Sequence, residues 1–294
     1  MKSHDNRGTI VVIHHERQPR ETEECFLISW MGKRWREWGF DVEHLYGIST
    51  RVEADLAIIH VDLSVVPDSY AEFAASYPQC VNLGLRDIRK SRISRNLVAA
   101  GEDYDGPVIV KTDLNHGGTP EVLLGLSPPR TRSLTSKLKR RFGIKDPLNI
   151  SSPADYLVYE NASQVPLSVF AEPSLVVERF LPESKKGTYY HRRYLFCGDV
   201  ERNEIWSGGD PINSSDHSQG LGHEVSVPEQ LRELRKQYAA DYGKLDYVLH
   251  DGRVEVFDVN RTPTGSPLEA DQKDAEWARL VADLLSEGIH TWLA

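Results

Sequence analysis

Residues 244–264 read KLDYVLHDGRVEVFDVNRTPT and carry the strongest structural signal in the chain. Apolar residues alternate on both sides of Asp251-Gly252, a pair of residues that strongly favours a tight β-turn. We therefore expect Leu245–His250 and Arg253–Val259 to pair as an antiparallel hairpin.

The same hairpin carries candidate metal ligands. Asp258 and Asn260 are two positions apart, so both face the same side of a strand, and their oxygens are the hard ligands that Mg²⁺ takes. A three-residue loop with a left-handed Gly252 would pair residue 246 with residue 256 and bring Asp246 to that face. The metal hypothesis therefore predicts this loop, whereas a two-residue turn would remove Asp246 from the site.

The first 84 residues show a different pattern, in which short apolar strands alternate with helices. We expect strands at Thr9–Ile13, Phe40–Leu45 and Asp55–Val61, and helices at Glu23–Trp38 and Ser69–Tyr77. This alternation predicts an α/β domain with a parallel sheet covered by helices.

Beyond residue 85 the pattern favours paired strands. Residues 189–198 and 200–206 are expected to pair around Gly198-Asp199, and 228–242 is expected to be helical. The last helix, 275–292, is expected to bury the apolar residues that recur at helical spacing: Trp277, Leu280, Val281, Leu284 and Ile289.

Composition excludes several classes of protein. The chain has 294 residues, 39% of them hydrophobic, and a net charge of −9. This net negative charge argues against a dedicated nucleic-acid binder, whose contacts with the phosphate backbone need a basic face. No apolar run is long enough for a membrane span or a signal peptide, and the three cysteines match no metal or redox spacing. We expect a cytoplasmic protein with no membrane partner.

Two further stretches carry chemistry of their own. Residues 107–111 (PVIVK) form an apolar strand with Lys111 at its exit, and the glycine-rich turn Asn115-His116-Gly117-Gly118 follows. Such a lysine can be a solvated strand end or a phosphate ligand, and backbone N–H groups freed of side chains can approach phosphate oxygens. The basic segment 128–145 is either a solvated insertion or a cover over phosphates or an anionic partner.

Taken together, these motifs resemble the ATP-grasp enzymes, a family that includes D-alanine–D-alanine ligase and glutathione synthetase. The C-terminal motif of the family is matched by Asp246, Asp251-Gly252, Asp258, Asn260 and Pro263, with Asp258 where the family usually has Glu. The resemblance covers about residues 80–265. It implies an N-terminal βαβ domain (1–84) and a two-subdomain ATP-grasp fold, α+β in character, divided into 85–180 and 181–294.

The resemblance also implies roles for particular residues. Lys111 and Arg193 would serve catalysis, and Asp246, Asp258 and Asn260 would hold the metal. Val177–Leu181 resembles the hinge that contacts adenine, and Glu183 is the candidate for the ribose. The nucleotide-binding residues implied are Lys90, Lys111, Asn115, His116, Gly117, Gly118, Glu178, Arg179, Phe180, Leu181 and Glu183.

The activity that the resemblance implies is ATP-dependent ligation of a small carboxylate to an amine through an acyl phosphate. It also implies ATP with Mg²⁺, or Mn²⁺, and a homodimer is common in the family. Two alternatives stay open: a kinase of the same fold acting on a small-molecule hydroxyl, and a non-catalytic nucleotide-binding or scaffold protein. His14, His15 and His60 lie near strand ends, where they face the acceptor substrate or are simply polar exits.

Overall fold

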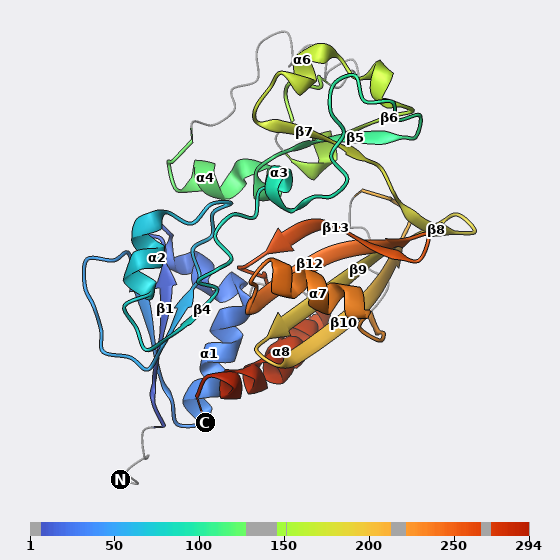
Figure 1. The fold of residues 1–294 in the computed structure, drawn as a ribbon. Coiled ribbons are helices and arrows are strands. Elements are labelled where there is room, and N and C mark those ends of the chain that lie inside the picture. Colours follow the sequence, from blue (N-terminus) through green and yellow to red (C-terminus); the bar gives the residue numbers. More distant parts are fainter. Residues whose placement is uncertain (1–6, 128–145, 151, 213–221, 266–271, 294) are drawn as a thin grey trace.

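The computed structural model describes residues 7–127, 146–150, 152–212, 222–265 and 272–293. A parallel sheet is followed along the chain by two antiparallel sheets, so the predicted α/β class with an N-terminal parallel sheet is confirmed (Figure 1). The basic segment that we considered as a cover over phosphates lies outside the described residues. Within the described part of the chain, no helix has the length and apolarity needed to cross a membrane.

The N-terminal sheet has the strand order β2-β1-β3-β4, and all of its pairings are parallel. Helices α1 and α2 cover its two faces, and alternate residues of β1 pack into separate apolar clusters on those faces. Strands buried on both faces explain the continuous apolar runs in the sequence. The bounds are β1 Thr9–His14, η1 Arg20–Cys25, α1 Leu27–Glu37, β2 Asp41–Tyr46, β3 Leu56–Ile59, α2 Asp68–Ala74 and β4 Gln79–Val81.

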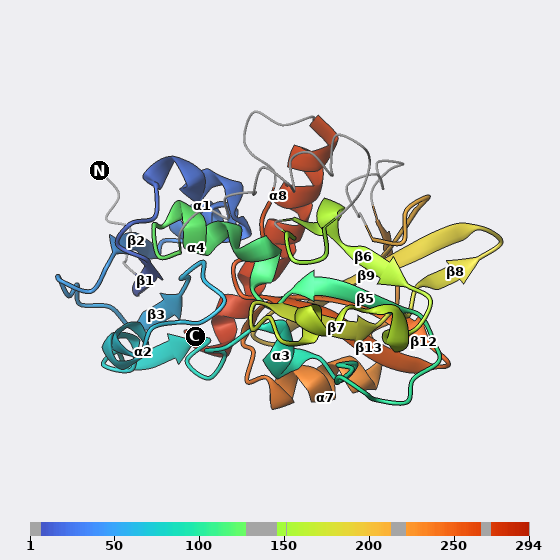
Figure 2. The same ribbon diagram turned by 90° about the horizontal axis from the view of Figure 1, so that it is seen from above.

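A three-stranded antiparallel sheet, in the order β6-β5-β7, follows. In the two views it lies over the β12–β13 edge of the largest sheet, with α3 and α4 beside it (Figures 1 and 2). The bounds are α3 Lys90–Ile93, β5 Val108–Thr112, η2 Asn115–Gly118, α4 Thr119–Leu123, η3 Pro153–Asp155, β6 Leu157–Tyr159, η4 Ala162–Gln164, α6 Leu167–Phe170 and β7 Leu175–Arg179.

The largest sheet has the order β11-β10-β9-β12-β13, and β8 pairs with β9. Helix α7 packs on one face, while α8 packs on the other and joins the core of the N-terminal sheet. The bounds are β8 Glu183–Lys185, β9 Thr188–Cys197, β10 Val200–Gly208, β11 His223–Glu224, α7 Glu229–Gln237, β12 Tyr242–His250, β13 Arg253–Asn260, α8 Gln272–Ser286 and η6 Glu287–Thr291.

The turn of the β12–β13 hairpin differs from the predicted three-residue loop. His250 pairs with Arg253, so the turn has two residues. Asp251 and Gly252 both have left-handed φ values, 50° and 74°. Two left-handed central residues define a type I′ turn, whose twist matches that of the flanking strands.

A β-bulge keeps Asp246 on the face of Asp258 despite the shorter turn. Tyr247 pairs with Val256, but Asp246 pairs with Asp258, so Phe257 is the extra residue of β13. Directly paired residues lie on the same face of a sheet. Asp246 and Asp258 therefore share a face after all, and the prediction that a two-residue turn excludes Asp246 was wrong.

The C-terminal helices differ from the prediction in extent and face. The helix expected at 228–242 ends at Gln237, and β12 begins five residues later. In α8, Leu280 and Leu284 are exposed, whereas Ala278, Val281, Ala282 and Leu285 are buried. The small alanines face α1 and allow close helix packing, so the apolar residue type alone did not identify the buried side.

Candidate functional site

A cavity of about 520 Å³ lies where the three sheets meet, between the carboxyl end of β3, the start of α3 and the end of β13. It brings together three lysines and three aspartates from segments far apart in sequence. These charged lining residues are Lys90, Lys111, Lys244, Asp62, Asp246 and Asp258. Such a balance of fixed charges suits a ligand with several phosphates together with a cation.

The three predicted metal ligands line this cavity together. Asp246 and Asp258 face each other across β12 and β13, and Asn260 follows at the end of β13. Lys244 Nζ lies 2.7 Å from a carboxylate oxygen of Asp246, and Asn260 Oδ1 accepts the N–H of Thr262 at 2.8 Å. Two carboxylates and an amide oxygen on one side of the cavity form a donor set that fits Mg²⁺.

Lys90 provides a positive charge opposite these carboxylates. Its side chain is 4% exposed, and its Nζ lies 3.5 Å from Asp258 Oδ1 and donates to the carbonyl of Leu114 at 3.2 Å. Burial is the largest single effect and lowers the pKa of Lys90, but Asp258, Tyr156 and Glu178 together outweigh it, and the pKa of Lys90 is raised. Burial in turn raises the pKa of Asp258, against the opposing effect of Lys90.

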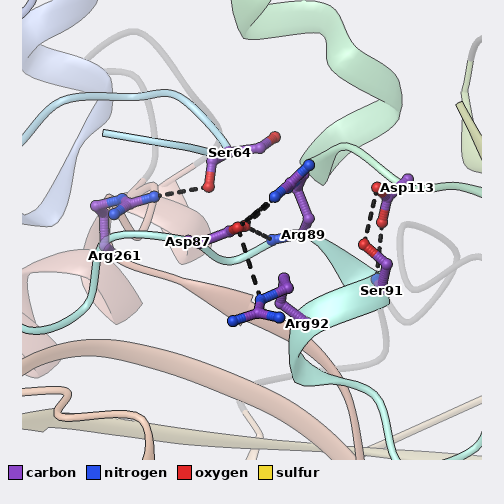
Figure 3. Close-up of polar contacts among 7 residues, drawn as sticks. All are labelled: Ser64, Asp87, Arg89, Ser91, Arg92, Asp113 and Arg261. Carbon is purple, nitrogen blue, oxygen red and sulfur yellow. Dashed lines mark hydrogen bonds and ion pairs between the residues drawn. The ribbon is translucent and has the colours of Figure 1, made fainter. Parts of the chain in front are cut away.

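Residues on either side of Lys90 fix its position (Figure 3). Asp113 accepts the Ser91 N–H at 2.7 Å and the Ser91 hydroxyl at 2.9 Å, and its carbonyl accepts the N–H of Lys90. Asp87 binds the guanidinium of Arg89. Because Asp113 comes two residues after Lys111, one network holds the backbone of both lysines.

Lys111 lies near the end of β5 and pairs with Val176 of β7, the strand that leads into the segment predicted to contact adenine. Its Nζ is 2.6 Å from Glu178 Oε2, the two side chains are 10% and 2% exposed, and Nζ also lies 5.4 Å from the Phe257 ring centre. The other oxygen of Glu178 has no hydrogen-bond partner among the described residues. Lys111 therefore carries a fixed charge at the boundary between the cavity and a second, smaller pocket described below.

The segment 115–118 forms a left-handed turn at the cavity wall. His116, Gly117 and Gly118 all have positive φ, and Asn115 and His116 line the cavity. The N–H of Asn115 donates to the hydroxyl of Ser64 at 2.8 Å, which fixes the turn against the N-terminal sheet.

Residues 178–181, in the segment predicted to contact adenine, line a second, smaller pocket of about 100 Å³. Arg179, Phe180 and Leu181 form part of its wall, and Lys111 and Phe257 line both spaces. The pocket lies between β7 and the β12–β13 hairpin and offers apolar walls to a flat ring.

Glu183 lines this pocket, but its carboxylate already accepts hydrogen bonds from other residues. Its carboxylate accepts two N–H groups of Arg192, at 2.7 and 2.8 Å, and the N–H of Leu249 at 2.9 Å. Three donors leave little acceptor capacity for a ribose hydroxyl.

The two arginines of β9 point to opposite faces, as expected from strand geometry. Arg192 faces Glu183 and Tyr247. Arg193 pairs with Asp246 across the sheet and so shares the face of the cavity carboxylates. Its guanidinium lies over the ring of Trp206, 4.6 Å from the centre, and Arg193 does not belong to the residues that line the cavity.

Two of the charged lining residues, Asp62 and Lys244, were not predicted from the sequence. Asp62 follows β3 and accepts a hydrogen bond from the Thr262 hydroxyl at 2.7 Å, and burial raises its pKa. The position of Asp62 after a buried parallel strand was a usable signal, since ligands gather at carboxyl ends of such strands. Lys244 lies two positions before Asp246, and the same alternation of faces would have found it.

The N-terminal histidines lie away from the cavity lining. His14 and His60 are fully buried, and His15 is 4% exposed. Burial lowers the pKa of His14 to about 3, and it lowers that of His60 well below its usual value. Phe26, which contacts His60 edge to face at 4.9 Å, separates this histidine from the cavity.

No family model and no curated protein matches the sequence. Among solved structures, D-alanine–D-alanine ligase from Bacillus anthracis complexed with ATP is 12% identical, with a TM-score of 0.46 over 96% of this chain and 98% of that one. A RimK domain ATP-grasp protein from Sphaerobacter thermophilus is 11% identical, with a TM-score of 0.47 over 94% and 99%. The macrocyclase MdnC of Microcystis aeruginosa, bound to its precursor peptide MdnA, is 11% identical, with a TM-score of 0.44 over 94% and 99%.

Proposed function

We propose that this chain is an ATP-grasp enzyme that uses ATP to join a small carboxylate to an amine. The observation that carries the proposal is that two buried lysines and a pair of facing carboxylates line one cavity, which continues into the apolar pocket beside the hinge. The lysines belong to α3 and β5, and the carboxylates to the β12–β13 hairpin.

In this proposal the base of the nucleotide occupies the pocket beside Phe180 and Leu181, and the phosphates extend past Lys111 into the larger cavity. Lys111 and Lys90 hold positive charge where the phosphoryl group is transferred, which is the main contribution a protein makes to this chemistry. Lys244 can add a third charge.

Asp246, Asp258 and Asn260 are the residues that would hold Mg²⁺. When bound, the ion neutralises the charge of the phosphates and fixes their position. Lys90 is now paired with Asp258 and Lys244 with Asp246. With Mg²⁺ on the two carboxylates, both lysines would bind phosphate oxygens instead. Arg193, on the same face but stacked on Trp206, would have to leave that ring to reach a phosphate.

Thermal unfolding with and without MgATP tests the nucleotide site. A ligand at about 100 times its Kd stabilises a protein by about 2.7 kcal/mol, which is visible as a higher Tm. We expect a shift in the wild type that requires Mg²⁺ and shrinks in Asp258→Asn. Arg253→Gln, an exposed change on the same strand, should keep the full shift. The absence of a shift in the wild type at millimolar MgATP would contradict the proposal.

Product analysis separates the ligase from its alternatives. With panels of carboxylates and amines, the ligase releases ADP and inorganic phosphate and forms an amide. A kinase would transfer the phosphate to a hydroxyl and release none. Nucleotide binding without turnover by any acid–amine pair or hydroxyl acceptor would favour the non-catalytic alternative.

A further inference from the structure

A second cluster of ligand-type side chains lies in the N-terminal domain, apart from the cavity. His14 ends β1, His44 is in β2, and Glu23 belongs to η1. One ligand atom from each residue lies within 4.8 Å of the other two. His14 Nε2 and His44 Nδ1 are 2.9 Å apart, and His44 Nδ1 is 3.0 Å from Glu23 Oε1.

The hydrogen bonds of this arrangement leave two tautomers for His14. An ionised carboxylate only accepts, so the contact with Glu23 places a proton on His44 Nδ1. His14 Nε2 then faces the same N–H, and if it carries a proton two donors confront each other. If it does not, the N–H of His44 lies between two acceptors, and the proton of His14 is on Nδ1, beside the side chain of Gln18.

A metal ion can take the place of the shared proton, because all three side chains offer a lone pair. Two imidazole nitrogens and one carboxylate oxygen form a set typical of Zn²⁺ sites that keep a fourth position open. Zn²⁺ bonds of about 2.1 Å at tetrahedral angles place neighbouring ligand atoms about 3.4 Å apart. Two of the observed separations, 2.9 and 3.0 Å, are shorter than this, so the imidazoles must turn and move apart to bind the ion.

Groups around the cluster suit an outer shell. The hydroxyl of Tyr46 donates to the second oxygen of Glu23 and so orients the carboxylate. The amide of Gln18 is buried beside His14 and interacts with its ring by a side-chain hydrogen bond. With Nε2 on a metal, His14 carries its proton on Nδ1, and an amide oxygen is a common acceptor for it.

We propose that His14, His44 and Glu23 bind a divalent transition-metal ion, Zn²⁺ being the best suited, at a site distinct from the carboxylates of the cavity. The bound ion ties η1 to the ends of β1 and β2. Phe26 follows η1 directly and lines the cavity, so the same tie holds one wall of the larger site. The proposal does not depend on the function proposed above.

Zn²⁺ binding to the full chain, made without a histidine tag and stripped with a chelator, tests the proposal. Competition with a chromogenic chelator measures the affinity and the number of ions. We expect the wild type to bind Zn²⁺ tightly and His44→Gln and Glu23→Gln to bind it about 100-fold more weakly, since even partners of the ligands change affinity by 10–100-fold. His250→Gln, an exposed histidine at the end of β12, should bind like the wild type.

Asp258→Asn distinguishes the two sites. If the Zn²⁺ affinity survives in Asp258→Asn and falls in His44→Gln, the ion is in the N-terminal cluster. Loss of the affinity in Asp258→Asn alone, equal affinity in all variants, or no binding by the wild type would overturn the proposal.

Co²⁺ gives a second readout that needs no variant. Co²⁺ in a tetrahedral site with imidazole ligands absorbs strongly in the visible, unlike Co²⁺ surrounded by oxygens. We expect such bands in the wild type and their displacement by Zn²⁺. Their absence would also overturn the proposal, even if Glu23→Gln or His44→Gln proved unable to fold.

Discussion

Lys111 has a proposed role in binding phosphate and also forms a buried ion pair with Glu178. Both side chains are buried, and their charged atoms are 2.6 Å apart. A buried pair of this kind adds little net stability, but removing one partner leaves an uncompensated charge in a poor solvent. Loss of activity on mutation of Lys111 would therefore reflect both lost phosphate contacts and lost stability.

Stability measurements separate these effects. We expect Lys111→Met to lower the free energy of unfolding by about 3–5 kcal/mol, because Glu178 then stays buried without its partner. The double variant Lys111→Met/Glu178→Gln should recover part of this loss, since the remaining amide is neutral. Denaturant unfolding of the single and double variants measures the difference. A double variant less stable than Lys111→Met would show that the charge of Glu178 has other partners.

At the scale of single residues, the sequence predicted which side chains line the cavity better than it predicted their partners. Asp246, Asp258, Asn260, Lys90 and Lys111 all line one cavity, because strand alternation and strand ends limit where side chains point. The sequence did not indicate that Arg192 engages Glu183 or that Lys90 faces Asp258. Such pairs join elements through the tertiary fold, and no local pattern encodes them.

At the scale of elements, the β12–β13 hairpin shows what local patterns can and cannot predict. Asp251-Gly252 correctly predicted the position of the turn and both strands, whereas the three-residue loop was wrong. The bulge at Phe257 was missed, because an extra residue in one strand leaves the apolar pattern almost intact. The buried face of α8 was predicted only in part. Val281 is buried as expected, but Leu280 and Leu284 are exposed, since the buried side is set by the contact with α1 and not by the apolar residues alone.

The turn itself gives a prediction about stability. Gly252 has a φ of 74°, and a Cβ added there would meet open space. Gly252→Ala should therefore cost only the backbone strain of a left-handed alanine, about 1–2 kcal/mol. Gly209→Ala, where a Cβ is also unobstructed and no positive φ is required, should change stability little. Urea unfolding of both variants measures this, and equal stabilities would argue against the left-handed turn.

At the scale of the whole molecule, the N-terminal sheet and the largest sheet share structure. Helix α8 packs against α1, and Trp35 donates its indole N–H to the carbonyl of Ser286 at 2.9 Å. The apolar cluster around α1 includes Leu195, Cys197 and Tyr242 of β9 and β12. The predicted boundary at residue 84 stays a prediction, but the C-terminal helix belongs to the N-terminal core.

Arg261 links the same two sheets through polar contacts. It is fully buried, and its guanidinium donates to the carbonyl of Leu63 at 2.8 Å. The same guanidinium donates to the carbonyl of Ser64 at 3.0 Å (Figure 3). It also donates to the carbonyl of Leu85. The end of β13, which carries the candidate metal ligands, is thereby attached to the N-terminal domain.

Replacing this arginine tests whether the attachment matters for the site. Arg261→Met keeps the length of the side chain but leaves buried carbonyls without donors, each at a cost of about 1–3 kcal/mol. We expect a large loss of stability in denaturant unfolding and a smaller MgATP-dependent Tm shift, because Asn260 and Thr262 lose their fixed position. Arg253→Met, at the exposed start of the same strand, should change neither. If Arg261→Met were destabilised but kept the full MgATP shift, the attachment would stabilise the fold without organising the site.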